Sequence, residues 1–316
     1  MEPDLTWGID TQLGAPFEQA TLGEATLVRL TGGPASARGV VLHVHGYNDY
    51  FFQAHLARAF AAAGYLFYAV DLRAAGRSLR PEQLPHYVTD LREQASDVAL
   101  AARTLRSLHP GLPLVVHAHS TGGLTTSLWA HAHRNQRGVD AGPDALVLDS
   151  PFLELPGSAV AKAIGTPVLD RLGPLRPLTE LSHGPSWYAM ALLRENGGEW
   201  EFDSGLKRPG GVPARAGWLR AVRRAQARVA RGLSIRCPVL LAASIASSPD
   251  GPGNPRVGST DTVLDVAQIV ARAPRLGRQV TVLRIAGGVH DLALSAPEPR
   301  EAYLREMLAW LDTVLP

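Results

Sequence analysis

The sequence has little that could cross-link the chain or carry it across a membrane. Cys237 is the single cysteine among 316 residues, which excludes an intramolecular disulfide and a cysteine-rich metal site. No apolar run reaches the ~20 residues of a membrane-spanning helix. The first ten residues, MEPDLTWGID, lack the basic and apolar regions of a signal peptide. These absences lead us to expect a cytoplasmic protein without a membrane span.

An excess of charge of one sign is also missing. The 31 basic and 29 acidic residues leave a formal net charge of +2, so the composition does not favour nucleic acid as a partner. Lysine is rare, because Lys162 and Lys207 are the only two and all other basic residues are arginine. The length is enough for one large α/β domain with an inserted lobe.

Short apolar runs alternate with longer segments of helical spacing along most of the chain. This rhythm predicts βαβ units, and therefore a mostly parallel sheet with helices on both faces. The expected strands, all predicted to be buried on both faces, are 39–46, 65–72, 112–120, 145–152, 237–244 and 279–287. The expected helices are 52–63, 88–108, 122–134, 261–272 and 297–313.

The alternation stops between Leu153 and Arg236, where proline and glycine recur. Roughly 80 residues between two strands are far more than an ordinary connection needs. Two stretches, 155–171 and 213–232, have amphipathic helical spacing. We therefore expect a mainly helical cap over the carboxyl edge of the sheet, where ligand sites of such sheets lie. The predicted domains are a core of residues 1–152 and 237–316 and a cap of residues 153–236.

A serine stands between an expected strand and an expected helix, in the stretch AHSTGG (118–123). The nucleophile elbow G-x-S-x-G holds its serine in a strained backbone at such a turn, with small residues on either side. Ala118 departs from the first glycine by one methyl group, and Gly122 and Gly123 follow the serine. Serines also end strands and cap helices without chemistry. The flanking strand and helix nevertheless favour Ser120 as a nucleophile.

A serine hydroxyl needs a base to take its proton, and the base needs an acid to hold its tautomer. In this fold the acid and then the histidine follow the serine in the chain. His290, in a glycine-rich loop after the last strand, is the expected base, whereas His183 is expected at the surface of the cap. Asp261, at the start of the predicted helix, is the expected acid. A carboxylate there also suits a helix N-terminus, and Asp149, at a strand end, remains the alternative acid.

A developing oxyanion needs backbone N–H donors. The N–H of Thr121 directly follows the nucleophile, and Tyr47 in the loop HGYNDY (45–50) is the expected second donor. Gly46 lets this loop turn beneath a substrate. His45 and His43 could suggest a metal pair, but no third ligand pattern accompanies them, so we expect no metal.

Aromatic side chains of the cap suit either an acyl pocket or a small core of the cap itself, and both interpretations stay open. Trp187 and Tyr188 belong to this group. Together with His45, Gly46 and His119 they are the candidate substrate-binding residues. No cofactor is expected.

Five segments together resemble the α/β-hydrolase superfamily, and more narrowly its monoacylglycerol lipase, lysophospholipase and serine aminopeptidase branch. They are HGYNDY, DLRAAGRS (71–78), HSTGG, DTVLDV and GGVHDL, which occur in family order over about residues 39–315. The resemblance implies a triad of Ser120, Asp261 and His290, with Tyr47 and Thr121 as oxyanion donors.

The implied activity is hydrolysis of a carboxylic ester through an acyl-enzyme on Ser120, with a small or lipid-like acyl ester as substrate. The same triad also serves amide, peptide, thioester and carbon–carbon bond hydrolases and acyltransferases, and the fold does not decide between them. A ligand-binding homologue without turnover is a further alternative. Such proteins usually lose a triad member, whereas all three candidates are present here.

Overall fold

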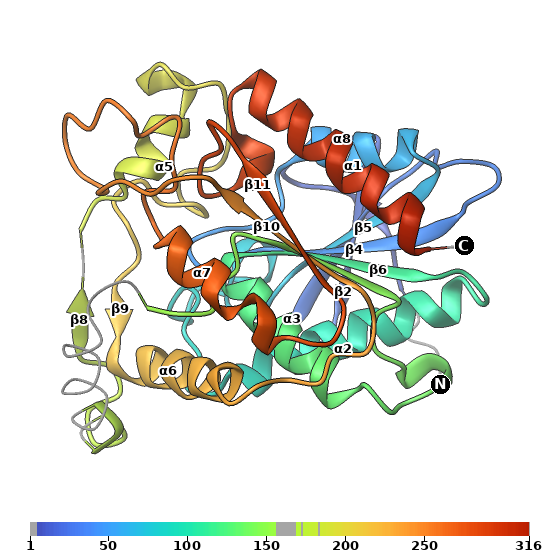
Figure 1. Ribbon diagram of the computed structural model, residues 1–316, viewed down its shortest axis with the longest axis horizontal. Helices are drawn as coiled ribbons and strands as arrows, with labels where there is room; N and C mark the ends of the chain where they lie inside the picture. The colour runs from blue at the N-terminus through green and yellow to red at the C-terminus, as the bar shows by residue number, and fades with distance from the viewer. Residues whose placement is uncertain (1–4, 156–168, 172, 183, 316) are drawn as a thin grey trace.

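The computed structural model describes residues 5–155, 169–171, 173–182 and 184–315, arranged around one nine-stranded sheet (Figure 1). The strand order is β1-β2-β3-β5-β4-β6-β7-β10-β11. All pairings from β5 to β11 are parallel, whereas β1, β2 and β3 are antiparallel to their neighbours. The strands are β1 (Gly8–Ile9), β2 (Phe17–Leu22), β3 (Ala25–Leu30), β4 (Gly39–Val44), β5 (Tyr65–Asp71), β6 (Leu114–His119), β7 (Ala145–Asp149), β10 (Val239–Ser244) and β11 (Val280–Ile285).

Helices cover both faces of the sheet, as predicted (Figure 1). Helices α1 (Ala54–Ala62) and α8 (Pro297–Val314) pack on one face, and α2 (Leu91–Leu108), α3 (Ser120–Ala132) and α7 (Val266–Arg272) pack on the other. Successive residues of a strand point to opposite faces, so Val41 joins the core under α1 and α8 while Leu42 joins the core under α2 and α3. None of the helices in the described ranges has the length and apolar character needed to span a bilayer.

The two ends of the sheet differ from the prediction. Every residue of β4, β6, β7 and β10 is buried, as expected for strands covered on both faces. The prediction of a fully buried strand at 279–287 was wrong, because β11 is the edge strand and leaves residues such as Val282 exposed. The antiparallel β2–β3 hairpin was not predicted, although Gly23 in its two-residue turn has the positive φ (63°) that favours glycine.

Between β7 and β10 the chain leaves the sheet, and we call residues 153–236 the insert. Its described part contains β8 (Glu180–Ser182), α5 (Trp187–Leu192), β9 (Ala214–Arg215) and α6 (Ala216–Ala230), with β8 and β9 paired antiparallel. The helix predicted at 213–232 is α6, which packs against the sheet core beside α3. Most of the stretch 155–171, predicted as amphipathic, lies outside the described residues, and so does His183.

Candidate active site

Ser120 stands where β6 ends and α3 begins, and its backbone is left-handed, with φ at +53°. Such a conformation costs an L-residue free energy and is held only by its surroundings. The surroundings explain the small neighbours: a Cβ on Gly122 would collide with the backbone carbonyl of His45, and one on Gly123 would lie 2.8 Å from the Cβ of Pro151. The methyl group of Ala118 is accommodated in the buried core. The turn therefore has the strained geometry of a nucleophile elbow.

The three residues of the predicted triad form one chain of hydrogen bonds. The Nε2 atom of His290 lies 3.0 Å from Oγ of Ser120, and its Nδ1 atom lies 3.0 Å from Oδ2 of Asp261. A carboxylate only accepts, so Nδ1 carries the proton and Nε2 is left to accept the hydroxyl hydrogen of Ser120. All three residues are buried, Ser120 being the most exposed at 7%. The site can therefore remove a proton from the serine without further rearrangement.

The carboxylate of Asp261 accepts hydrogen bonds from the backbone as well as from the imidazole of His290. Its Oδ1 atom accepts the N–H groups of Val263 and Leu264, at 2.9 and 2.8 Å. Burial alone would raise the pKa of Asp261, but the His290 ring and these hydrogen bonds outweigh it and lower the pKa below its ordinary value. The predicted helix start at Asp261 was wrong, since α7 begins at Val266 and Asp265 is its N-cap. Asp261 instead lies in the preceding loop, where it can face the histidine.

Asp149, the alternative acid, has a different partner. Its carboxylate accepts the N–H of Leu292, at 3.1 Å, and the hydroxyl of Ser150 rather than a ring N–H of His290. Burial, reinforced by the nearby Asp291 carboxylate, raises its pKa well above the ordinary value. Asp149 therefore holds the chain just after His290 in place.

The loop after β4 lies directly against the elbow, because a Cβ on Gly46 would come within 2.8 Å of the Cβ of Ser120. The ring of His45 orients this loop: Nε2 accepts the N–H of Leu72 (3.0 Å), so Nδ1 carries the proton and donates it to the carbonyl of Gly46 (2.7 Å). A trans peptide places its N–H opposite its carbonyl, and the N–H of Tyr47 therefore points away from His45. The N–H of Thr121, in the first turn of α3, has no partner within its helix.

Comparison with known proteins identifies the family of the chain. Residues 35–246 match the model of the family described as serine aminopeptidase, S33. The chain belongs to this family. A stretch of 91 residues is 41% identical to a monoacylglycerol lipase of Mycolicibacterium smegmatis, and it spans 27% of this chain and 30% of that protein.

Solved structures match over far more of the chain. A monoacylglycerol lipase of Paleococcus ferrophilus has a TM-score of 0.65 at 20% identity, covering 91% of this chain and 99% of its own. A soluble variant of the Saccharomyces cerevisiae monoglyceride lipase has a TM-score of 0.65 at 16% identity, covering 100% and 96%. These likenesses show the α/β-hydrolase fold, which was predicted.

Most of the candidate substrate-binding residues make contacts within the protein itself. His45 is buried with both ring nitrogens hydrogen-bonded, so it shapes the loop instead of facing a ligand. The ring of His119 packs edge-on against His290 with centroids 4.8 Å apart. Tyr188 packs on the same ring at 5.7 Å, and its hydroxyl accepts the N–H of Asp291. Trp187, beside Tyr188, is half-buried.

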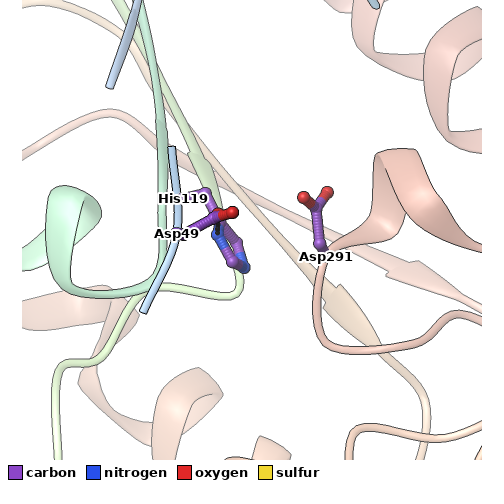
Figure 2. A group of neighbouring side chains, drawn as sticks. All are labelled: Asp49, His119 and Asp291. Atoms are coloured by element: carbon purple, nitrogen blue, oxygen red, sulfur yellow. Dashed lines mark hydrogen bonds and ion pairs between the residues drawn. The ribbon is translucent and has the colours of Figure 1, made fainter. Parts of the chain in front are cut away.

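Sequence reasoning missed a buried cluster of Asp49, His119 and Asp291, whose ligand atoms lie within 4.8 Å of one another (Figure 2). Carboxylate and imidazole groups this close could hold a metal ion, but the carboxylate oxygens and Nδ1 of His119 already have partners, whereas Nε2 of His119 is buried without one. Asp49 accepts from His119 (3.3 Å) and from the ammonium of Lys207 (2.9 Å). Asp291 accepts from the side-chain amide of Gln53 and the N–H of Ala293. Lys207 thus supplies positive charge that a cation would otherwise bring.

The electrostatics of the cluster are those of an ion-pair network. Burial favours a neutral His119, but the carboxylates of Asp291, Asp49 and Asp149 outweigh it and raise the pKa of His119 to about 9. Burial likewise opposes ionisation of Asp49, yet Lys207 and His119 hold the pKa of Asp49 well below its ordinary value. The raised pKa favours a positively charged imidazole at the position just before Ser120.

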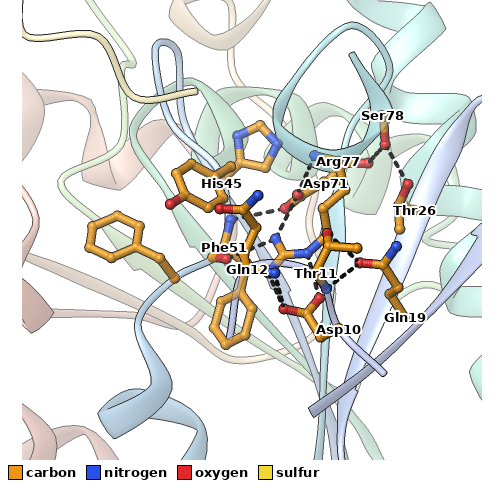
Figure 3. Close-up of polar contacts among 12 residues, drawn as sticks. Asp10, Thr11, Gln12, Gln19, Thr26, His45, Phe51, Asp71, Arg77 and Ser78 are labelled. Carbon is orange, nitrogen blue, oxygen red and sulfur yellow. Dashed lines mark hydrogen bonds and ion pairs between the residues drawn. The ribbon is translucent and has the colours of Figure 1, made fainter. Parts of the chain in front are cut away.

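A second buried network involves the motif DLRAAGRS and lies next to Phe51, the residue that follows the loop HGYNDY (Figure 3). Arg77 donates to Asp71 and to both carboxylate oxygens of Asp10, and all three side chains are at most 1% exposed. Asp71 also accepts the N–H of Phe51, and Arg77 donates to the carbonyl of Phe51. The motif therefore fixes the chain that follows the loop HGYNDY.

Proposed function

We propose that the protein is a serine hydrolase that cleaves a carboxylic ester through an acyl-enzyme on Ser120. The supporting observation is the hydrogen-bonded chain from Ser120 through His290 to Asp261, with 3.0 Å at each contact. The left-handed backbone of Ser120 adds independent support, because such strain at a reactive residue indicates function.

In this mechanism His290 accepts the hydroxyl proton as Ser120 Oγ bonds to the ester carbonyl carbon. Asp261 stabilises the imidazolium that forms, and the N–H groups of Thr121 and Tyr47 donate to the oxyanion. The intermediate collapses by breaking the bond to the alcohol oxygen, which takes the proton from His290. Water then attacks the acyl-enzyme with His290 as the base, and releases the carboxylic acid and free Ser120.

We propose a lipid-like acyl ester as the substrate, in line with the monoacylglycerol lipases that the chain resembles in sequence and fold. We also propose residues 153–236 as a cap inserted into the core formed by 1–152 and 237–316. The neighbouring positions of β7 and β10 in the sheet support this division. In the described part of the cap, Tyr188, Trp200 and Phe202 pack with Tyr50 and Phe52 of the core, which favours a packing role for these aromatic residues.

The test is labelling with a fluorophosphonate probe and mapping of the adduct by mass spectrometry, with Ser120→Ala and His290→Ala as comparisons. We expect an adduct on Ser120 that is lost in both variants. A panel of matched esters, amides and thioesters then identifies the bond that is cleaved. A folded wild-type protein that forms no adduct would refute the proposal, and faster cleavage of amides than of esters would replace it with peptide or amide hydrolysis.

A further inference from the structure

Four consecutive side chains of the loop after β4 each contact one segment of the insert. We call residues 47–50 the oxyanion loop and residues 203–213 the anchor segment. The contacts are Tyr47 Oη to the carbonyl of Pro213 (3.0 Å), Asn48 to the backbone of Arg208 (2.9 and 2.8 Å), Asp49 to Lys207 Nζ (2.9 Å) and Tyr50 Oη to the N–H of Asp203 (2.8 Å). This side of the loop is therefore built on the insert.

The contact of Lys207 with Asp49 is the most deeply enclosed of the four. The side chains of Lys207 and Asp49 are 4% and 1% exposed. The rings of Phe52, Tyr188 and Phe202 surround the ammonium, with centroids 5.6, 5.8 and 5.9 Å away. A buried charge without its partner is strongly unfavourable. If the anchor segment moved away, Asp49 would lose the ammonium of Lys207 and keep only the longer contact with His119 (3.3 Å) as a charged partner, so this ion pair holds the segment to the loop.

The contact of Asn48 is independent of charge. Its side-chain amide donates to the carbonyl of Arg208 and accepts the N–H of the same residue. Asn48 has φ at +53°, a left-handed conformation that asparagine tolerates better than most residues. The loop therefore makes its sharp turn at the residue that hydrogen-bonds to the backbone of the anchor segment.

Asp49 also connects this ion pair to the residues of the proposed triad. Asp49 accepts from Nδ1 of His119, the residue just before Ser120. The ring of His119 packs against His290. A chain of direct contacts therefore runs from Lys207 through Asp49 and His119 to the proposed nucleophile and base.

We propose that Lys207 is a positioning residue of the active site: through Asp49 it holds the oxyanion loop so that the N–H of Tyr47 stays directed at the oxyanion. The anchor segment then forms a fixed wall of the site and moves only together with the loop. Lys207 itself touches neither the substrate nor the reacting atoms. The catalytic part of this inference rests on the proposed ester hydrolysis.

The test compares Lys207→Met, which keeps the length of the side chain but removes its charge, with Lys207→Met/Asp49→Asn, which removes both charges. Loss of one well-directed oxyanion donor costs about 10²–10³-fold in kcat, so we expect Lys207→Met to lower kcat by about 10–100-fold with KM changed much less. The double variant should recover part of kcat, because it removes the buried carboxylate that Lys207→Met leaves with His119 as its one charged partner. Arg194→Met, at an exposed ion pair of the insert, is the matched control.

Hydrogen–deuterium exchange of the peptides that contain 46–50 and 203–213 gives a readout that needs no activity. Both should exchange faster in Lys207→Met than in the wild type and in Arg194→Met. Asn48→Gly, which suits a positive φ and removes only the amide contacts, should show the same increase if Lys207→Met does not fold. Unchanged exchange in the loop, or faster exchange with wild-type kcat, overturns the inference. Absence of any adduct on wild-type Ser120 refutes the proposed function instead, and the exchange result still decides whether the loop is anchored.

Discussion

The Nε2 atom of His290 lies 3.0 Å from Oγ of Ser120, although 170 positions separate the two residues in the chain. Ser120 follows β6 directly, and His290 lies in the loop that follows β11. The sheet brings these strand ends to the same edge, because β6, β7, β10 and β11 are parallel neighbours in that order. The contact therefore results from the strand order, not from any local motif.

Two replacements of Ser120 should distinguish the role of its hydroxyl group in turnover from the cost of its backbone strain in stability. Ser120→Ala should abolish turnover yet fold normally, since only the hydroxyl is lost. Ser120→Gly should also be inactive, but more stable than Ser120→Ala by about 1 kcal/mol, because glycine adopts the observed φ of +53° without steric cost. Urea denaturation of both variants measures this difference. Equal stability of the two variants would show that the left-handed turn stores no strain.

The two candidate acids should differ sharply when each is changed to asparagine. Asp261→Asn should lower kcat by about 10⁴-fold, because the amide favours the wrong tautomer of His290. Asp149→Asn should stay within about tenfold of the wild type, since Asp149 accepts the N–H of Leu292 and not a ring N–H of His290. Steady-state kinetics on the best ester of the panel gives both values. The reverse order of the two effects would make Asp149 the acid.

The stability of the protein should depend on pH through His119. Its pKa is raised from 6.5 to about 9 in the folded protein, so its stabilising contribution is complete below about 6.5 and is lost as the pH rises through about 9. The free energy of unfolding should therefore fall by up to about 3 kcal/mol over that interval.

The control for this prediction is His119→Asn, which retains a donor toward Asp49 but does not titrate. Denaturation curves at several pH values should show a smaller alkaline loss of stability in this variant. If the wild type and the variant lose stability equally between these pH values, other groups are responsible.

Arg77 should be a strong determinant of stability. Arg77→Met leaves Asp10 and Asp71 buried without their partner, and breaking such a pair typically costs about 3–5 kcal/mol. Arg305→Met, which removes an exposed ion pair with Glu306, should cost less than about 1 kcal/mol. Thermal or urea unfolding of the two variants checks the contrast. Similar losses in both would mean that the buried network contributes little.

Local signals in the sequence were sufficient to predict that Ser120 lies at a turn from strand to helix and that His290 lies in a loop after the last strand. The glycines that meet the steric demands of the turn, Gly122 and Gly123, lie within three positions of Ser120. His290 lies in the loop after a recognisable strand. The position of Asp261 relative to the helix was harder to predict. The segment DTVLDV contains two aspartates, and helix propensity does not tell which of them begins the helix. Asp265 caps the helix through Ala267 and Gln268, which leaves Asp261 free to turn toward His290.

The buried ion pairs could not be predicted from the sequence. Asp49 and Lys207 are separated by 158 positions, and Lys207 lies in an irregular stretch without periodicity that would reveal its burial. A lysine is usually exposed, so pattern and propensity both predict the wrong environment. The rarity of lysine was the one feature of the sequence that drew attention to Lys207. Its burial is evident only from the structure, which places aromatic rings around the ammonium.

The contacts between the oxyanion loop and the anchor segment also limit which sequence changes relatives of this protein can accept at these positions. Lys207 and Asp49 recognise each other by side chain, so a substitution at one position should be accompanied by a substitution at the other. Asn48 binds only the backbone of Arg208, so position 208 should accept many residue types while position 48 remains nearly fixed. Among homologues, positions 49 and 207 should therefore covary while position 208 varies freely, if the contacts of the loop with the anchor segment are retained.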